Sequence, residues 1–354
     1  MKIYINGIGN ISPQKTFEPE KFFREVISIS GNRHICIEPA YEGFIDPRML
    51  RRMSRIIRMG WTAAKICLTD AGVEIPDAII TGTGMGCIED TEKFLFAIYE
   101  NDERLLPPTP FIQSTHNTIG AQIALMLQCT NYNLTYTQRG IAFENALIDA
   151  LTLMHEPGNM YILVGGFDEM TDNQIMFYNR LNYYKSQIDD NLKLIDHKDS
   201  GTIAGEGTAF FMLSHERTTN SYAVINDVDS FNYPTNNEFV LNKIQEFLDR
   251  NHLTFSDIDL LLCGFNGDFN LDSIYTDVIG HLFRKTAVGY FKHLCGEYHT
   301  ASAFALWLAS NILKRQFIPD VIRLNEIKAN TVKNILIYNH YRNTNHSLIL
   351  LSSK

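Results

Sequence analysis

The chain has 354 residues, of which 45% are hydrophobic and 20% are charged, so it is long enough to bury a large core. Its formal charge of −9 argues against nucleic-acid binding, because that function needs a basic surface to replace phosphate counterions. No apolar run reaches the ~18 residues of a membrane span and the first residues lack a secretion signal, so we expect a cytoplasmic protein.

Strand-like and helix-like stretches alternate along the first part of the chain. An alternating apolar pattern predicts the strands, and an apolar period near 3.6 residues predicts the helices. In chain order we expect a strand at 2–9, a helix at 47–72, a strand at 77–86, helices at 88–100 and 120–128, a strand at 132–137, a helix at 143–155 and strands at 159–169 and 201–216. Buried strands flanked by helices predict a layered α/β fold with its sheet covered on both faces.

A second series with the same strand–helix order follows the polar link Arg217–Ser221. Its expected elements are a strand at 222–231, a helix at 238–251, a strand at 257–267, a helix at 273–283, a strand at 286–290, a helix at 300–313 and strands at 334–341 and 346–352. We place a domain boundary here, which gives an N-terminal half at 1–216 and a C-terminal half at 217–354. Since no long linker separates them, we expect the halves to pack as one unit.

Six cysteines are scattered along the chain: Cys36, Cys67, Cys87, Cys129, Cys263 and Cys295. They form no C-x-x-C pair and have no regular spacing, which predicts neither a zinc site nor a disulfide framework. We expect free thiols in a reducing compartment, with no bound metal and no cofactor.

The stretch YNLTYTQRGIAFENALIDA, residues 132–150, runs from a strand into an amphipathic helix. A corner of this kind often holds a catalytic nucleophile, because unpaired N–H groups and the helix dipole stabilise negative charge there. The residues at this corner are Gln138, Arg139 and Gly140, and none of them can act as a covalent nucleophile.

Five motifs along the chain resemble, in this order, stretches of β-ketoacyl synthases with the thiolase fold. They are NGIGNISP (6–13), RRMSRIIRMGWTAAKICLTDAG (51–72), PTPFIQSTHNTIGAQIAL (108–125), GGFDE (165–169) and GEGTAFFML (205–213), and weaker similarity continues through KHLCGEYHTASAFA (292–305). The resemblance implies a five-layered αβαβα fold of two similar halves and usually a dimer. It also implies transfer of an acyl chain from an acyl carrier protein to a cysteine, followed by condensation with a decarboxylating malonyl unit.

The resemblance places the family's catalytic residues on unsuitable side chains here. Aligning the helix places the nucleophile at Gly140, and a shift of one or two residues gives Arg139 or Gln138. The first family histidine falls on Gly264 or its neighbour Cys263. In KHLCGE, Lys292 and Gly296 match the second histidine motif, but Glu297 replaces the histidine, and its carboxylate would repel a malonyl carboxylate.

A glycine-rich family loop near the C-terminus corresponds to residues 340–343, where bulky side chains would fill the space. The expected vestigial site therefore consists of Gln138, Arg139, Gly140, Lys292, Glu297, His340 and Arg342. Arg139 is a cation at a helix N-terminus, which is an unfavourable position. We expect it to reach a carboxylate such as Glu297, to lie at a subunit interface, or to be solvated.

Three functions are compatible with this pattern. The leading interpretation is a non-catalytic subunit similar to a chain-length factor, which forms a heterodimer with an active ketosynthase in fatty-acid, polyketide or polyene synthesis. A second is a divergent acyltransferase with a relocated site drawn from Cys295, Cys263, His293 and His299. A third is a homodimer that binds an acyl carrier protein.

Several arginines form the one dense basic stretch in an acidic chain. Arg51, Arg55 and Arg58 have the i, i+4, i+7 spacing of one helical face. This face is expected either to dock an acidic carrier protein or partner subunit, or to be a solvated charged surface.

Overall fold

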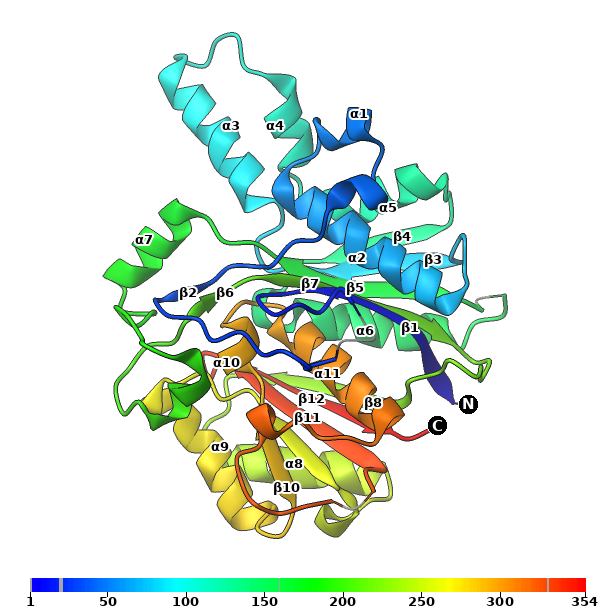
Figure 1. The fold of residues 1–354 in the computed structure, drawn as a ribbon, viewed down its shortest axis with the longest axis vertical. Helices are drawn as coiled ribbons and strands as arrows, with labels where there is room; N and C mark the ends of the chain where they lie inside the picture. Colours follow the sequence, from blue (N-terminus) through cyan, green and yellow to red (C-terminus); the bar gives the residue numbers. More distant parts are fainter. Residues whose placement is uncertain (1, 19–21, 159, 330) are drawn as a thin grey trace.

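The structure is a computed structural model that describes residues 2–18, 22–158, 160–329 and 331–354. Its fold is α/β, with a mixed ten-stranded sheet in the order β10-β9-β11-β12-β8-β1-β7-β5-β3-β4 (Figure 1). Within the described residues, none of the helices combines the length and the apolar character needed to span a bilayer.

The first five strands of this sheet form one half of the fold. They are β1 (Ile3–Ile11), β3 (Ala78–Gly82), β4 (Tyr132–Tyr136), β5 (Ile162–Asp168) and β7 (Gly207–Ser214). Strand β7 runs antiparallel to both β1 and β5, whereas β5, β3 and β4 run parallel to one another. The order is therefore β1-β7-β5-β3-β4, with β4 at the free edge.

The other five strands repeat this topology. They are β8 (Ala223–Asn232), β9 (Leu260–Cys263), β10 (Ala287–Tyr290), β11 (Asn334–Tyr341) and β12 (Asn345–Ser352), in the order β8-β12-β11-β9-β10. Strand β12 is antiparallel to β8 and β11, and β11, β9 and β10 are parallel. The two halves meet where β1 pairs with β8 over three residue pairs, beginning with Ile3 opposite Ile225.

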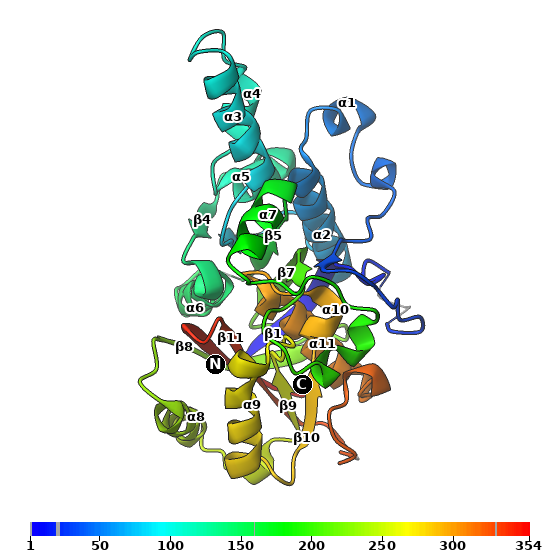
Figure 2. The same cartoon turned by 90° about the vertical axis from the view of Figure 1, so that its left-hand side faces the viewer.

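Helices cover the outer faces of both halves and fill the space between them. Helices α2 (Arg55–Ala71) and α5 (Thr118–Leu127) pack on the first half, and α8 (Asn237–Arg250) and α9 (Phe269–Leu282) pack on the second. Helices α6 (Ala142–Leu153) and α11 (Ala301–Arg315) contact strands of both halves and lie between them (Figures 1 and 2). The layers therefore alternate helix, sheet, helix, sheet, helix.

The apolar residues of the strands explain this layering. In β5, Ile162 and Val164 belong to the central core, whereas Leu163 and Phe167 belong to the outer core under α2. Successive side chains of a strand point to opposite faces, so a continuously apolar strand must be covered on both sides. Helix α11 is buried from Ala301 to Leu313, as its small and apolar residues on every face require.

The remaining elements are shorter or lie at the periphery. They are β2 (Arg33–His34), β6 (Ala204–Gly205), α1 (Pro47–Leu50), α3 (Ile88–Glu100), α4 (Pro108–Gln113), α7 (Asp172–Arg180), α10 (Lys292–Cys295), and the 3₁₀ turns η2 (Tyr41–Gly43), η3 (Arg139–Ile141), η4 (Asn191–Asp196), η5 (Phe255–Asp257) and η6 (Asp320–Ile322). Helices α3 and α4 project from one end of the molecule in both views (Figures 1 and 2).

The expected continuous helix over 47–72 is wrong. Helix α1 ends at Leu50, and α2 begins at Arg55 after Ser54, whose backbone is extended with φ −65° and ψ 166°. An extended residue cannot continue a helix, so the two segments are separate.

The domain boundary expected at residue 217 lies in the link between β7 and β8. Side chains tie this link to the first half, since Ser221 Oγ donates to Asn6 Oδ1 at 2.6 Å and Asn220 Nδ2 donates to Asp70 Oδ1 at 2.9 Å. The division into two domains stays a prediction.

Candidate functional site

The corner that the resemblance aligns with the family's nucleophile lies in the 3₁₀ turn η3 at the start of α6. Gln138 and Arg139 are exposed, Arg139 has a positive φ of 48°, and Gly140 is buried. A Cβ atom added to Gly140 would overlap Tyr341 Cβ and lie 2.9 Å from Tyr341 Cγ. Tyr341 therefore occupies the space that a side chain at position 140 would need.

A buried ion pair lies at the second expected histidine position. Lys292 Nζ is 2.9 Å from Glu297 Oε1 and 2.8 Å from Glu297 Oε2, and the two side chains are 0% and 5% exposed. Lys292 also donates to the carbonyl oxygen of His340 at 2.9 Å, and Asn266 Nδ2 donates to Glu297 Oε2 at 2.7 Å. Both charges are thus neutralised and hydrogen-bonded within the protein, as burial requires.

The first expected histidine position is equally crowded. A Cβ atom on Gly264 would overlap Asn339 Oδ1 and lie 2.7 Å from Tyr275 Oη. Asn339 comes from β11 and Tyr275 from α9, and both are buried. An imidazole at position 264 does not fit without moving these two elements.

The side chains of the hairpin between β11 and β12 pack into the site and close it. His340 stacks on Tyr275 with ring centroids 4.6 Å apart, its Nε2 lies 3.1 Å from the carbonyl oxygen of Leu271, and its Nδ1 accepts from the Asn343 N–H at 3.2 Å. Burial lowers the pKa of His340 well below its usual value. Tyr341 stacks on His299 at 4.5 Å, and the Arg342 guanidinium lies 3.2 Å from the ring centroid of Tyr183.

The cavity that remains among these side chains has a volume of about 10 Å³. Its walls include Glu297, His299, Tyr341, Tyr178 and Tyr184. A single water needs about this much space, and an acyl group needs far more. In this conformation the site has no room for an acyl chain.

Two carboxylates of the GGFDE motif hold the site's surroundings together. Asp168 Oδ1 accepts from Thr83 Oγ1 and from the N–H groups of Gly84 and Met85, while Oδ2 accepts from the N–H and hydroxyl of Thr300. Asp168 thereby fixes the start of α11 against β5. Glu169 is buried and accepts from the N–H of Glu89 in the first turn of α3 at 3.1 Å, and burial raises the pKa of this carboxyl to about 8.

The four residues of the alternative acyltransferase site do not come together. Cys295 lies in the central core and Cys263 in the outer core of the second half, and burial raises the pKa of both thiols. Burial lowers the pKa of His293 to about 3, and its Nε2 lies 3.0 Å from the carbonyl oxygen of Val321. The neighbour of the His299 ring is Tyr341, and burial lowers the pKa of His299 as well. These are properties of packed side chains rather than of a thiolate–imidazole pair.

The expected arginine face is not formed. Arg51 follows the last residue of α1, whereas Arg55 and Arg58 lie in α2, so the three do not share one helix. Arg55 makes a bidentate ion pair with the buried Glu206 and a further one with Glu38, while Arg58 Nε donates to the carbonyl oxygen of Met53. The Arg55 guanidinium is therefore already paired with carboxylates within the protein.

The suggested reach of Arg139 to Glu297 is also wrong, because Lys292 and Asn266 take both oxygens of Glu297. The sequence pattern did not single out Asn266, Asn339 or Tyr275, since ordinary polar and aromatic residues carry no spacing signal. The large side chains of residues 340–343 are the sequence signal that indicates that the space beside Gly140 is filled, as it is by Tyr341.

Residues 6–219 match the family profile described as Beta-ketoacyl synthase, N-terminal domain. The chain belongs to the β-ketoacyl synthase family. No similar sequence was found among curated proteins.

Solved structures of β-ketoacyl synthases share the fold over the whole chain. The ishigamide ketosynthase/chain length factor structure has a TM-score of 0.83 at 17% identity, covering 100% of this chain and 99% of that one. A β-ketoacyl synthase from Burkholderia phymatum STM815 has a TM-score of 0.76 at 14% identity, with coverage of 100% and 99%. A ketosynthase in complex with its chain length factor from Xenorhabdus doucetiae has a TM-score of 0.75 at 15% identity, with coverage of 100% and 98%. At these identities the similarity establishes the fold.

Proposed function

We propose that this chain is a non-catalytic β-ketoacyl synthase-like subunit that pairs with an active ketosynthase in fatty-acid, polyketide or polyene biosynthesis. The observation that carries the proposal is the filling of the site. Tyr341 occupies the space at Gly140, Asn339 and Tyr275 crowd Gly264, and Glu297 is bound by Lys292. Neither covalent acylation nor histidine-assisted decarboxylation has a suitable side chain here.

The electrostatics of the site support the same proposal. Loss of a malonyl carboxylate is helped by donors that stabilise the developing negative charge. All three N–H bonds of the Lys292 ammonium are already directed at Glu297 and at the carbonyl oxygen of His340. The Lys292 ammonium therefore binds groups within the protein, and no N–H of it is left to donate to a substrate.

Exposed apolar side chains on neighbouring elements, together called the apolar surface, support association with a partner subunit. They lie on α3, the loop after it, α4, α5 and the edge strand β4: Leu95, Phe96, Tyr99, Leu105, Phe111, Ile112, Leu125, Tyr132 and Leu134. Leu105 is 99% exposed. Exposed apolar patches and unpaired edge strands are features that monomeric proteins avoid and interfaces use. Two of the similar structures are a ketosynthase described together with a chain length factor.

Intact-protein mass spectrometry tests the proposal directly. The chain is incubated with acyl-loaded carrier protein and malonyl-loaded carrier protein, with and without a candidate catalytic ketosynthase from the same genome. We expect acyl mass on the ketosynthase and none on this chain. Acyl mass on this chain would overturn the proposal, and Cys295 and Cys263 would be the first residues to map.

Restoring a cysteine is not expected to restore catalysis. The Gly140→Cys variant places a side chain where Tyr341 lies, so we expect a loss of about 1–3 kcal/mol in the free energy of unfolding and no acyl-enzyme. The matched Gly280→Cys variant, whose Cβ meets no heavy atom within 4 Å, controls for a new thiol. Efficient acylation of Gly140→Cys, absent from Gly280→Cys, would contradict a closed site.

Charge placed on the apolar surface is expected to disrupt pairing. In co-expression with the candidate ketosynthase, we expect Leu105→Glu/Ile112→Glu to weaken the complex at least about tenfold. The control is Phe317→Glu, which charges an exposed phenylalanine just after α11. If the wild-type chain forms a homodimer by light scattering and binds no ketosynthase, the homodimeric alternative is favoured. If Leu105→Glu/Ile112→Glu binds the ketosynthase as tightly as Phe317→Glu does, the interface lies on another part of the chain.

A further inference from the structure

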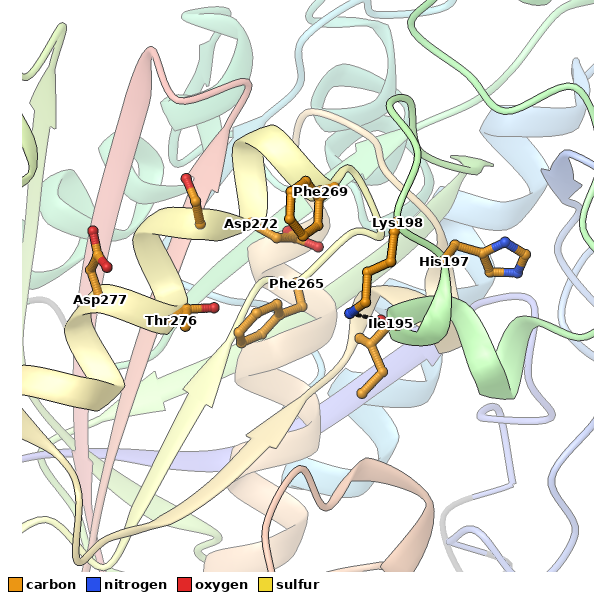
Figure 3. Close-up of a pocket in the computed structure, with 9 residues that line it drawn as sticks. Ile195, His197, Lys198, Phe265, Phe269, Asp272, Thr276 and Asp277 are labelled. Atoms are coloured by element: carbon orange, nitrogen blue, oxygen red, sulfur yellow. Dashed lines mark hydrogen bonds between the residues drawn. The ribbon is translucent and has the colours of Figure 1, made fainter.

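A partly enclosed cavity, separate from the filled site, lies between η4 and the start of α9. Its volume is about 240 Å³, and its walls are formed by Ile195, His197, Lys198, Phe265, Phe269, Asp272, Ser273, Thr276 and Asp277 (Figure 3). It shares no lining residue with the 10 Å³ cavity beside Tyr341. The loop 264–268 separates the two, because Asn266 donates to Glu297 on one side while Phe265 lines this cavity on the other.

Two phenylalanines and an isoleucine give the cavity apolar walls. Phe265 is buried and is fixed by Tyr275, whose ring centroid is 4.8 Å from its own. Phe269 is the first residue of α9 and remains 54% exposed, although it lines the cavity. A ring inserted beside these two would be covered on one face and would take exposed aromatic surface out of water.

The charged side chains at the cavity differ in the hydrogen bonds that they already make within the protein. Asp272 accepts the N–H groups of Asn266 and Gly267 at 3.0 and 2.8 Å, and Asp277 accepts from Asn237 Nδ2. Burial raises the pKa of the Asp272 carboxyl to about 7, which reduces its negative charge near neutral pH. Asp272 therefore carries less negative charge than an ordinary carboxylate, and Asp277 lies on the opposite side of the two phenylalanines from Lys198 (Figure 3).

Lys198 is an exposed cation at the cavity and has weak contacts with the rest of the protein. Its Nζ lies 3.5 Å from the carbonyl oxygen of Ile195, at the limit of a hydrogen bond, and 5.9 Å from the ring centroid of Phe269. In Figure 3 its side chain lies on one side of the two phenylalanines, and Thr276 and Asp277 lie on the other. An anionic group held by Lys198 would thus lie beside the two phenylalanines.

We infer that this cavity binds a small aromatic carboxylate, with its ring against Phe265 and Phe269 and its carboxylate on Lys198. The volume accommodates a ligand of about ten heavy atoms, for which a dissociation constant on the order of 1 mM is expected. The site is independent of the proposed pairing with a ketosynthase, so either can fail without the other.

Calorimetry and ligand-observed NMR on the full chain test this inference with three probes that share one ring: phenylacetate, 2-phenylethanol and phenethylamine. We expect phenylacetate to bind about fivefold more tightly than 2-phenylethanol, and phenethylamine to bind least well. Tighter binding of phenethylamine would overturn the assignment of Lys198 as the anchoring charge. No binding of any probe up to about 10 mM would overturn the site.

Three variants locate the binding. Lys198→Met is expected to reduce the affinity for phenylacetate about fivefold and to leave 2-phenylethanol unchanged. Phe269→Ala is expected to abolish binding of both probes while the fold is retained, because this side chain is exposed at a helix start. Lys193→Met, which replaces an exposed lysine of the preceding η4 turn outside the cavity, is the matched control and should change the affinity for neither probe. Unchanged affinity in Lys198→Met or Phe269→Ala would contradict the inference.

Discussion

Replacing Lys292 by methionine is expected to lower the free energy of unfolding by about 3–5 kcal/mol. The variant removes the cation that neutralises Glu297 and leaves a carboxylate, 5% exposed, with Asn266 as its one remaining side-chain donor. It also leaves the carbonyl oxygen of His340 without the Lys292 donor. An unpaired buried charge is costly, because the protein interior solvates it far less well than water does.

The double variant Lys292→Met/Glu297→Leu separates charge from packing. Replacing both members of a buried ion pair by apolar residues of similar size is often nearly neutral, so we expect most of the lost stability to return. Urea unfolding of both single variants and the double variant measures the coupling.

The matched control is Arg250→Met, which removes the cation from an exposed pair with Asp227 and Asp229. We expect a change of at most about 1 kcal/mol. A loss in Lys292→Met no larger than in Arg250→Met would contradict this prediction, because it would mean that the buried pair contributes little to stability.

The sequence pattern predicted the regular elements well where periodicity and end signals agree. Residues 238–251 were expected to be helical, and α8 spans Asn237–Arg250 with Asn236 accepting from the N–H of Phe239 as its N-cap. The break between α1 and α2 was missed because the apolar spacing continues across it. Ser54, the N-cap residue of α2, was the available signal for a second start.

The site was less predictable, because its decisive contacts join residues far apart in the chain. Gly140 is closed by Tyr341, two hundred residues later, and although the bulk of residues 340–343 indicates a filled site, the sequence does not show which side chain meets Gly140. Lys292 and Glu297 are close in sequence, yet their pairing depends on the turn at Gly296, whose φ is 75°. A residue with a side chain adopts that φ reluctantly, so here glycine sets the geometry of the ion pair.

The Glu169→Gln variant is expected to be more stable than the wild type at alkaline pH. The pKa of Glu169 is about 8 in the folded protein because the carboxyl is buried, against 4.5 for an ordinary glutamate. A carboxyl whose pKa is raised on folding contributes its full stability below pH 4.5, and this stability is lost as the pH rises through 8. The glutamine resembles the neutral carboxyl at every pH, so the gain over the wild type should grow to about 5 kcal/mol above pH 8.

Comparing the two proteins is essential, because other buried groups titrate in the same range. Burial lowers the pKa of His34 to about 4, so its contribution has the opposite sign: it is present above pH 6.5 and is lost as the pH falls through 4. That contribution is common to both proteins and cancels in the difference of their unfolding free energies. We expect this difference to be small at pH 4.5 and to rise steadily to pH 8. A difference that does not change with pH would show that Glu169 is ionised throughout, with the first turn of α3 stabilising its charge through the Glu89 N–H.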